Sequence, residues 1–233
     1  MTYRILLVED EEAIRKFTKI NLEREGYEIL EASTGEEGIE TALDKEPHVV
    51  VLDLMLPGIS GYEVCETLRT KMPRIGIIML TAKSQEVDRI LGLEKGTDDY
   101  LMKPFNPKEL VLRIQALIRR LNIEPVESTD NKNIFEYGPF RMDSYSRKFY
   151  RDDVEIELTP TEIAIIKNFI SMAGKALTRE EILHQVWGDE YQGETKIVDV
   201  NIRRIRTKIE KNPAKPEFLE TVWGVGYRWK QIN

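Results

Sequence analysis

Short apolar runs recur along the first half of the chain, separated by stretches whose apolar residues keep a helical period. The runs cover Arg4–Val8, Glu28–Glu31, Val49–Leu52, Gly76–Leu80 and Tyr100–Met102. Runs without polar alternation indicate strands buried on both faces, and strands that alternate with helices favour parallel pairing. The pattern predicts an α/β fold with a doubly wound five-stranded parallel sheet, whose ligands bind beyond the carboxyl ends of the strands.

The pattern changes in the second half of the chain. Short strands punctuated by turn residues occupy 134–158 and predict a small antiparallel sheet. Three helices are expected next: Thr159 and Thr178 are suited to cap the first two, and the third covers 196–211. A hairpin over 219–230 is expected to end the domain.

Between the two patterns lies IEPVESTDNK, which contains turn-forming and charged residues without apolar periodicity. At 233 residues, the chain is long enough for two domains that each have a core. We therefore expect a first domain over residues 1–121, a linker over 122–132 and a second domain over 133–233.

The composition is that of an ordinary globular protein, with 41% hydrophobic and 32% charged residues. The single cysteine, Cys65, excludes an intramolecular disulfide or a cysteine-based zinc site and favours a reducing compartment. The start MTYRILLVEDEE lacks the features of a signal peptide, and no apolar run approaches the roughly 20 residues of a membrane helix. We expect a cytoplasmic protein that does not bind membranes.

The net charge of −7 is unevenly distributed. Residues 1–121 carry 17 basic and 22 acidic side chains, residues 122–132 carry one and three, and residues 133–233 carry 16 of each. Within that neutral half, residues 196–211 hold six basic side chains against two acidic ones. The overall acidity therefore does not exclude nucleic acid as a partner.

Charged and hydroxyl side chains stand at the carboxyl ends of four predicted strands. Glu9 and Asp10 follow the first strand, Asp53 the third, Thr81 the fourth and Lys103 the fifth. Carboxylates brought together raise one another's pKa unless a cation neutralises them, and such oxygen ligands suit Mg²⁺. Each residue alone is compatible with a helix cap or a surface charge. Together they are the parts that phosphoryl transfer requires.

The same segments resemble the response-regulator receivers of two-component signalling. LLVEDEE, VVLDLMLPGISGYEV, IIMLTAK and GTDDYLMKPF match hallmark segments of that family within residues 1–121. The resemblance implies a flavodoxin-like receiver in which Asp53 accepts a phosphoryl group from a sensor histidine kinase. It also implies that Asp10 and Asp53 bind Mg²⁺ together with the backbone carbonyl of Met55, and that Glu9 assists through water.

The resemblance further implies that Thr81 and Lys103 contact the phosphoryl oxygens. Tyr100 matches the switch aromatic of the family, which moves inward with Thr81 after phosphorylation; the alternative is a plain core tyrosine. The chain departs from the family at Thr97 in GTDDY, where alanine is common. That position lies away from the expected metal, so the implied mechanism is unchanged.

A helix with one apolar and one basic side is expected over residues 195–211. Its polar positions include Asn201, Arg203, Arg204, Arg206 and Lys208. Such a helix fits the major groove of DNA, where arginine pairs with guanine or phosphate and asparagine with adenine. The alternative is a helix whose charges are merely solvated.

ELTPTEIAII, LTREEILHQVWG, VDVNIRRIRTKIE and TVWGVGYRW resemble the winged helix-turn-helix output domain of the OmpR/PhoB subfamily. The resemblance implies that 195–211 is the recognition helix, that 219–230 is the wing, and that 187–194 is a loop that meets RNA polymerase. The residues predicted to bind duplex DNA are Lys196, Asn201, Arg203, Arg204, Arg206, Lys208, Thr221, Trp223 and Arg228.

Trp223 occupies a wing position where a better-known version of the motif carries arginine, a residue suited to the minor groove. The tryptophan puts insertion into that groove in doubt. The sequence leaves two alternatives open at this position, packing on the sugar-phosphate backbone and covering the core of the domain.

A homodimer on phosphorylation is also implied by the receiver resemblance. Its expected interface combines charged and apolar residues of the fourth and fifth helices, with cross-subunit pairs of Arg89 with Glu109, Asp99 with Arg113 and Asp98 with Arg120. Ile90, Leu93 and Val111 form the apolar part. In isolation these charges read as ordinary surface ion pairs. A dimer would bind tandem or inverted DNA half-sites more tightly than a single domain does.

Two alternative functions remain. An aspartyl nucleophile with Mg²⁺ also serves metal-dependent phosphatases and phosphotransferases, but these need a second acid two residues later, where this chain has Met55. The other alternative is a DNA-binding regulator whose receiver is only a constitutive dimerisation module. The absence of one of the acidic residues, the threonine or the lysine would have favoured it, but all of them are present. We expect a transcription regulator rather than an enzyme, whose receiver acts on its own phosphoryl group only.

Overall fold

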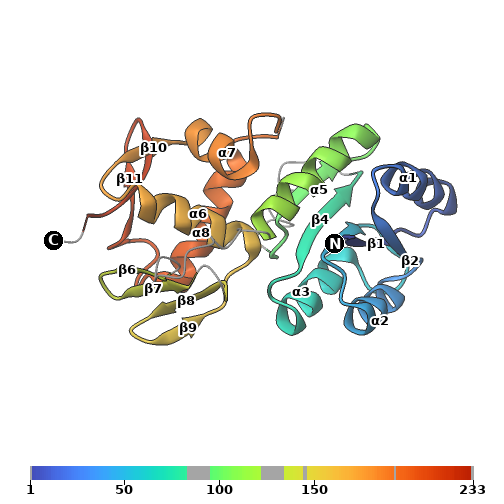
Figure 1. The fold of residues 1–233 in the computed structure, drawn as a ribbon, viewed down its shortest axis with the longest axis horizontal. Helices are drawn as coiled ribbons and strands as arrows, with labels where there is room; N and C mark the ends of the chain where they lie inside the picture. The colour runs from blue at the N-terminus through green and yellow to red at the C-terminus, as the bar shows by residue number, and fades with distance from the viewer. Residues whose placement is uncertain (1, 83–94, 122–133, 144–145, 192, 232–233) are drawn as a thin grey trace. The chain divides into compact units, whose positions relative to one another are not determined.

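The computed structural model describes residues 2–82, 95–121, 134–143, 146–191 and 193–231. The chain divides into two compact units, Met1–Ile118 and Arg119–Asn233 (Figure 1). The predicted linker lies outside the described residues. None of the helices in the described ranges has the length and hydropathy that crossing a membrane requires.

A five-stranded parallel sheet forms the centre of the first unit, which confirms the predicted fold class. Its strands lie in the order β2-β1-β3-β4-β5. Because β1 lies between β2 and β3, the direction of strand addition switches at β1, and the crevice for ligands lies beyond the ends of β1 and β3. The strands are β1 Arg4–Val8, β2 Glu28–Ala32, β3 Val49–Asp53, β4 Gly76–Thr81 and β5 Asp99–Met102.

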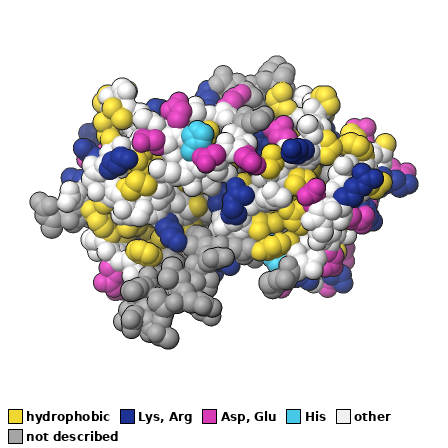
Figure 2. Space-filling view, turned by 45° about the horizontal axis from the view of Figure 1, so that its top comes forward, with side chains coloured by type: hydrophobic (Ala, Val, Ile, Leu, Met, Phe, Trp, Pro, Cys, Tyr) yellow, Lys and Arg dark blue, Asp and Glu magenta, His cyan; other side chains and the backbone are white. Residues whose placement is uncertain are grey.

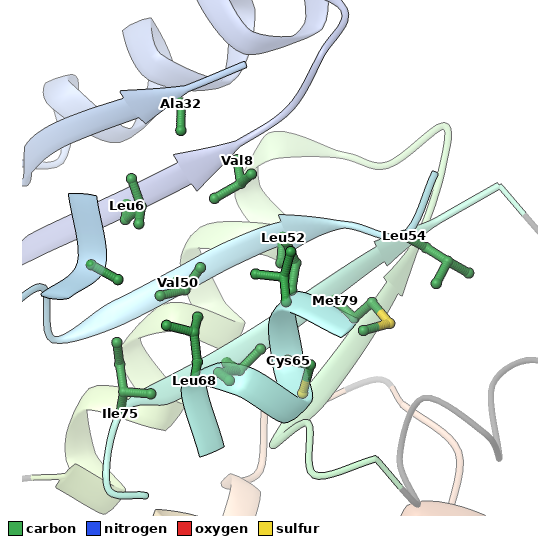
Figure 3. Packing of buried hydrophobic residues seen from close by; sticks show 13 residues of the cluster. Leu6, Val8, Ala32, Val50, Leu52, Leu54, Cys65, Leu68, Ile75 and Met79 are labelled. Carbon is green, nitrogen blue, oxygen red and sulfur yellow. The ribbon is translucent and has the colours of Figure 1, made fainter. Parts of the chain in front are cut away.

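Helices cover both faces of this sheet. Figure 1 shows α1 and α5 on one face and α2 and α3 on the other. On the second face, Val8 and Leu52 of the sheet pack with Val64 and Leu68 of α3 in one buried cluster that also includes Met79 (Figure 3). The helices are α1 Glu12–Arg24, α2 Gly35–Lys45, α3 Gly61–Lys71 and α5 Pro107–Leu121.

The second unit combines two antiparallel sheets with three helices. One sheet has the order β6-β7-β8-β9 and the other β10-β12-β11. The strands are β6 Ile134–Tyr137, β7 Phe140–Asp143, β8 Lys148–Arg151, β9 Val154–Ile156, β10 Ala176–Thr178, β11 Leu219–Val222 and β12 Gly226–Trp229. The helices are α6 Pro160–Ser171, α7 Arg179–Trp187 and α8 Lys196–Ile209. Strands β11 and β12 form the expected C-terminal hairpin.

The helix starts follow from the capping residues. Thr159 accepts a hydrogen bond from the backbone of Glu162, and Thr178 accepts one from the backbone of Glu181; each glutamate accepts one in return from the amide of its threonine. Both capping boxes satisfy backbone groups that would otherwise lack partners at the start of a helix. The predicted starts of α6 and α7 are thereby confirmed.

Candidate functional site

The residues predicted at the strand ends lie together in the first unit. Glu9 and Asp10 directly follow β1, and Asp53 is the last residue of the neighbouring β3. Thr81 ends β4. Lys103 follows β5, and its backbone amide donates to the carbonyl of Thr81 at 2.8 Å. The parallel register therefore brings one hydroxyl, one ammonium and three carboxylates to the same edge of the sheet.

Lys103 joins the two buried carboxylates of this group. Its Nζ lies 2.7 Å from Oδ2 of Asp53 and 2.7 Å from Oε2 of Glu9. Glu9 is fully buried, and Asp53 is nearly so. Burial lowers the pKa of Lys103, but its hydrogen bonds to Asp53 and Glu9 outweigh burial and raise the pKa above its ordinary value. The ammonium therefore remains charged between the two acids.

Three carboxylates are more negative charge than one lysine neutralises. One oxygen each of Glu9, Asp10 and Asp53 lie within 4.8 Å of one another. Burial raises the pKa of Glu9 to about 7, and Asp53 adds to this shift while Lys103 opposes it. An all-oxygen cluster with uncompensated negative charge has the donor set that Mg²⁺ prefers. The residues present thus fit the metal expected from the sequence.

Backbone contacts fix Asp53 and the loop that follows it. The amide of Met55 donates to Oδ1 of Asp53 at 3.1 Å. A Cβ at Gly61 would lie 2.2 Å from the carbonyl oxygen of Asp53, so only glycine allows the start of α3 to approach the end of β3 this closely. Arg15, which the sequence did not single out, donates from Nη1 to the carbonyl oxygen of Glu9 at 2.6 Å.

The two residues expected to switch occupy neighbouring strands. Thr81 is buried at the end of β4. Tyr100 is half-buried on β5 and packs against the hydrophobic cluster of β1, β3, β4 and α3. Its position agrees with both of the alternatives weighed from the sequence, a switch residue and a core tyrosine.

The charged residues of the predicted dimer surface are largely engaged within the chain. Nη1 of Arg113 lies 2.8 Å from Oδ1 of the fully buried Asp99, and its Nη2 lies 2.6 Å from Oε1 of Glu109. Val111 is buried in α5, and Arg120 lies in the last turn of that helix. The predicted interface residues Arg89, Ile90 and Leu93 lie outside the described residues.

Asp98 requires a correction. It was expected at the surface, but its carboxylate is fully buried. Its Oδ2 lies 2.5 Å from Nη2 of Arg69 and accepts a hydrogen bond from the amide of Ile77 at 2.9 Å. These contacts tie the start of β5 to α3 and β4, so Asp98 is part of the interior of the receiver.

In the second unit, α8 carries its basic residues in two different environments. Arg204 Nη2 and Lys208 Nζ lie 2.8 Å and 2.7 Å from the two carboxylate oxygens of Glu162, which is fully buried at the start of α6. Arg206 donates from Nε to the carbonyl of Leu219 at 2.8 Å. These three basic residues therefore connect α8 to α6 and to the β11–β12 hairpin.

Asn201 requires the second correction. The prediction that it contacts a base is wrong for this structure, because its side chain is fully buried and donates to the carbonyl of Ile197 at 2.8 Å. The sequence contained a signal for this. Asn201 lies four residues from both Ile197 and Ile205, so helical periodicity places it on their buried side.

The exposed residues of α8 are Lys196, Arg203, Thr207 and Lys208, the last of which also pairs with Glu162. Spacings of seven and four residues put Lys196, Arg203 and Thr207 on one face of the helix. On the face of the molecule shown in Figure 2, basic and acidic side chains are interspersed among hydrophobic ones.

In the hairpin, Thr221 accepts a hydrogen bond from Arg206, and Arg228 pairs with Glu220 at 2.9 Å. Trp223 is 91% exposed at the tip. The structure therefore removes one of the two alternatives for this residue, because the side chain does not cover the core.

Comparisons with known proteins agree with this arrangement. Residues 5–115 match the family described as "Response regulator receiver domain", and residues 153–229 match "Transcriptional regulatory protein, C terminal". The site residues Glu9, Asp10, Asp53, Thr81 and Lys103 all fall within the first match. The exposed face of α8 and the hairpin fall within the second.

Relatives match along the whole chain. The chain is 40% identical over 235 residues to the alkaline phosphatase synthesis transcriptional regulatory protein PhoP of Bacillus subtilis (strain 168), covering 99% of this chain and 98% of the relative. It is similar to the structure of a RitR mutant, with a TM-score of 0.79, 28% identity and coverage of 99% and 100%. DrrB, a Thermotoga maritima OmpR/PhoB homologue, gives a TM-score of 0.51, 33% identity and the same coverage. The chain belongs to the OmpR/PhoB family of response regulators and is a transcription regulator of a two-component system.

Proposed function

We propose that Asp53 accepts a phosphoryl group from a sensor histidine kinase, and that this modification controls binding of the second domain to promoter DNA. The observation that carries the proposal is the position of Lys103, whose ammonium lies 2.7 Å from both Asp53 and Glu9 at the end of the sheet. We further propose that residues 1–121 form the receiver and 133–233 the DNA-binding domain, joined by 122–132, and that the protein acts in the cytoplasm.

The chemistry follows from the charges around Asp53. A carboxylate oxygen of Asp53 attacks phosphorus and forms an acyl phosphate, while the bond from phosphorus to the donor nitrogen breaks and its electron pair leaves with the donor. Lys103 stabilises the charge that the phosphoryl oxygens bring into this buried site, and the Thr81 hydroxyl can donate to one of them. The receiver in this view acts on its own phosphoryl group and has no external substrate.

Glu9, Asp10, Asp53 and the carbonyl of Met55 would hold Mg²⁺ in this site. When bound, Mg²⁺ supplies positive charge that offsets the negative charge of the carboxylates and the phosphoryl group. Lys103 follows β5 and contacts Asp53 directly, and Thr81 ends the neighbouring β4.

Labelling with a small phosphodonor tests the phosphoacceptor. In the presence of Mg²⁺, the wild type is expected to gain the mass of one phosphoryl group, and hydroxylamine should remove it because an acyl phosphate is labile to that nucleophile. Asp53→Asn should gain no mass. Asp44→Asn, which changes an exposed carboxylate at the end of α2, is the matched control and should be labelled normally. Labelling of Asp53→Asn would overturn the assignment.

Phosphorylation is proposed to favour a receiver homodimer. Thr81 and Tyr100 lie on β4 and β5, and Tyr100 directly follows Asp99, the partner of Arg113 in α5. A change at the phosphoryl site can therefore reach α5 through one strand. A dimer places two DNA-binding domains near each other and raises the effective concentration of the second on tandem or inverted half-sites. Residues 187–194 are proposed to meet RNA polymerase.

We propose that the exposed face of α8, with Lys196 and Arg203, reads the DNA. Arg203→Ala should lower affinity for a duplex selected from a random-sequence pool by roughly ten-fold or more, as for loss of a base or phosphate contact. Arg24→Ala removes an exposed arginine from the receiver helix α1 and serves as the control, with unchanged affinity expected. Equal affinities of the two variants would contradict the proposed role of α8.

A further inference from the structure

Arg15 of α1 contacts the backbone of the turn between β1 and α1, where Asp10 lies. Its Nη1 donates to the carbonyl oxygen of Glu9 at 2.6 Å and to the carbonyl oxygen of Asp10 at 3.2 Å. Only 16% of the arginine side chain is exposed. Both contacts are made to the backbone of residues whose carboxylates belong to the proposed metal site, so Arg15 can act on that site without touching it.

The two carbonyl groups lie on either side of the Cα of Asp10. Each belongs to a planar peptide group, so holding both of them restrains the two backbone rotations at Asp10 and sets the direction in which its Cβ leaves the chain. The Asp10 carboxylate is exposed, and it has no hydrogen bond or ion pair within the part of the chain that the structure describes. The backbone therefore directs this carboxylate toward Glu9 and Asp53, whose oxygens lie within 4.8 Å.

Strand β2 supports both the arginine and the turn. Nε of Arg15 lies 3.7 Å from Oε2 of Glu31 on β2, and the other oxygen of Glu31 pairs with Lys19. Because a guanidinium is planar, contacts at Nε and Nη1 together set the orientation of its plane. The amide of Glu9 donates to the carbonyl of Ala32, also on β2, at 3.1 Å. The guanidinium is thus held in the orientation in which it meets the two carbonyls.

We propose that Arg15 is a positioning residue for Mg²⁺, which acts by holding the peptide groups on both sides of Asp10. This inference rests on the proposed Mg²⁺ site of the receiver. Groups that orient metal ligands without touching the metal commonly contribute to metal affinity. The sign of the effect identifies the cause. A nearby cation repels Mg²⁺, so removing Arg15 would tighten binding if only its charge mattered, whereas loss of positioning weakens binding.

Calorimetric titration of the full-length protein with Mg²⁺ provides the test. Arg15→Met keeps an unbranched apolar side chain but loses the donors, and it should bind Mg²⁺ about ten-fold more weakly than the wild type. Arg15→Lys keeps the charge without the planar donor group, and its affinity should lie between the two. Lys16→Met removes an exposed charge from the next position of α1 and is the matched control, with no loss of affinity expected.

Labelling by a small phosphodonor separates positioning from a general structural role. For Arg15→Met, the Mg²⁺ concentration that gives half-maximal labelling should rise by the same factor as the dissociation constant. Mg²⁺ binding by Arg15→Met and Arg15→Lys as tight as in the wild type, or tighter, would overturn the inference. So would a loss of labelling that leaves this Mg²⁺ concentration unchanged. If the wild type itself binds no Mg²⁺, the proposed metal site fails as well.

Discussion

The two units of this regulator use buried carboxylates for different purposes. In the receiver, the buried Asp53 is the proposed phosphoacceptor, and Lys103 lies at hydrogen-bond distance from both Asp53 and Glu9. In the DNA-binding unit, the buried Glu162 pairs with Arg204 and Lys208 and thereby anchors α8 to α6. Arg203, which directly precedes Arg204 in the sequence, is exposed.

This difference shows that basic residues close in sequence do not share one role. A buried charge is tolerated only when it is paired. A basic residue that pairs with a buried acid therefore helps to stabilise the fold. In α8 the pairing with Glu162 fixes the helix against α6. In the receiver the pair of Lys103 and Asp53 forms the proposed site, because an incoming phosphoryl group would need the same ammonium.

The largest expected effect comes from breaking the pairing in the DNA-binding unit. Glu162→Gln removes the charge shared by Arg204 and Lys208 and should lower the free energy of unfolding by about 3 kcal/mol. Urea denaturation followed by tryptophan fluorescence reports this unit, since all three tryptophans lie in it. Glu180→Gln, an exposed acid in the first turn of α7, is the control. A loss below about 1 kcal/mol would show that Glu162 does not anchor α8.

The pH dependence of the stability difference between the wild type and Glu162→Gln tests the pairing of Glu162 further. Burial raises the pKa of Glu162, but Arg204 and Lys208 outweigh it and hold the pKa below the ordinary value of 4.5. A lowered acid pKa contributes stability above the unfolded pKa that disappears as pH falls through the folded one. The gap between wild type and Glu162→Gln should therefore be constant near neutral pH and shrink below about pH 4.5. Denaturation midpoints across this range measure it; a gap that widens in acid contradicts the assignment.

A smaller effect is expected from Lys103→Gln in the receiver. Without the ammonium, the carboxylates of Glu9 and Asp53 lose their shared cation, and Mg²⁺ should bind more tightly. The stabilisation by Mg²⁺ should then exceed that of the wild type by about 1 kcal/mol at the same metal concentration, as measured by calorimetry. Asp53→Asn should show less stabilisation than the wild type. Equal Mg²⁺ responses in all three proteins would place the metal elsewhere.

The smallest effect is expected at the wing tip. Trp223→Ala removes a side chain that is 91% exposed, so the free energy of unfolding should change by no more than about 0.5 kcal/mol. Thermal unfolding of the full chain checks this value. A substantial loss of stability would mean that Trp223 packs within the domain, which would contradict its exposure in the structure.

The residues of the receiver site could be predicted from the sequence, because one rule of sheet topology is enough to bring them together. The carboxyl ends of parallel strands meet at one edge, so Asp53 and Lys103 could be placed together although 50 residues separate them. The predictions for Asn201 and Asp98 were wrong for the same reason, because a polar or charged side chain was assumed to be exposed. Asn201 and Asp98 are both fully buried, and only Asn201 had a visible signal in its helical spacing.

The anchoring of α8 could not be predicted in the same way. The sequence identified Thr159 as a helix cap, but it did not reveal the role of Glu162. That role depends on how α6 packs against α8, because Glu162 and its partner Lys208 are 46 residues apart in the chain. Side-chain pairing across helices follows from tertiary packing, for which no local pattern exists. The exposure of Trp223 was undetermined for a similar reason, because the turn conformation decides which way the side chain points.

The central claim is that phosphorylation of Asp53 controls DNA binding by the second domain. Its most direct test is the affinity of full-length protein for a selected duplex with two half-sites, measured with and without a small phosphodonor. The account predicts that the phosphodonor tightens binding of the wild type at least about ten-fold and leaves Asp53→Asn unchanged. An equal response of Asp53→Asn, or no response of a fully labelled wild type, would contradict it.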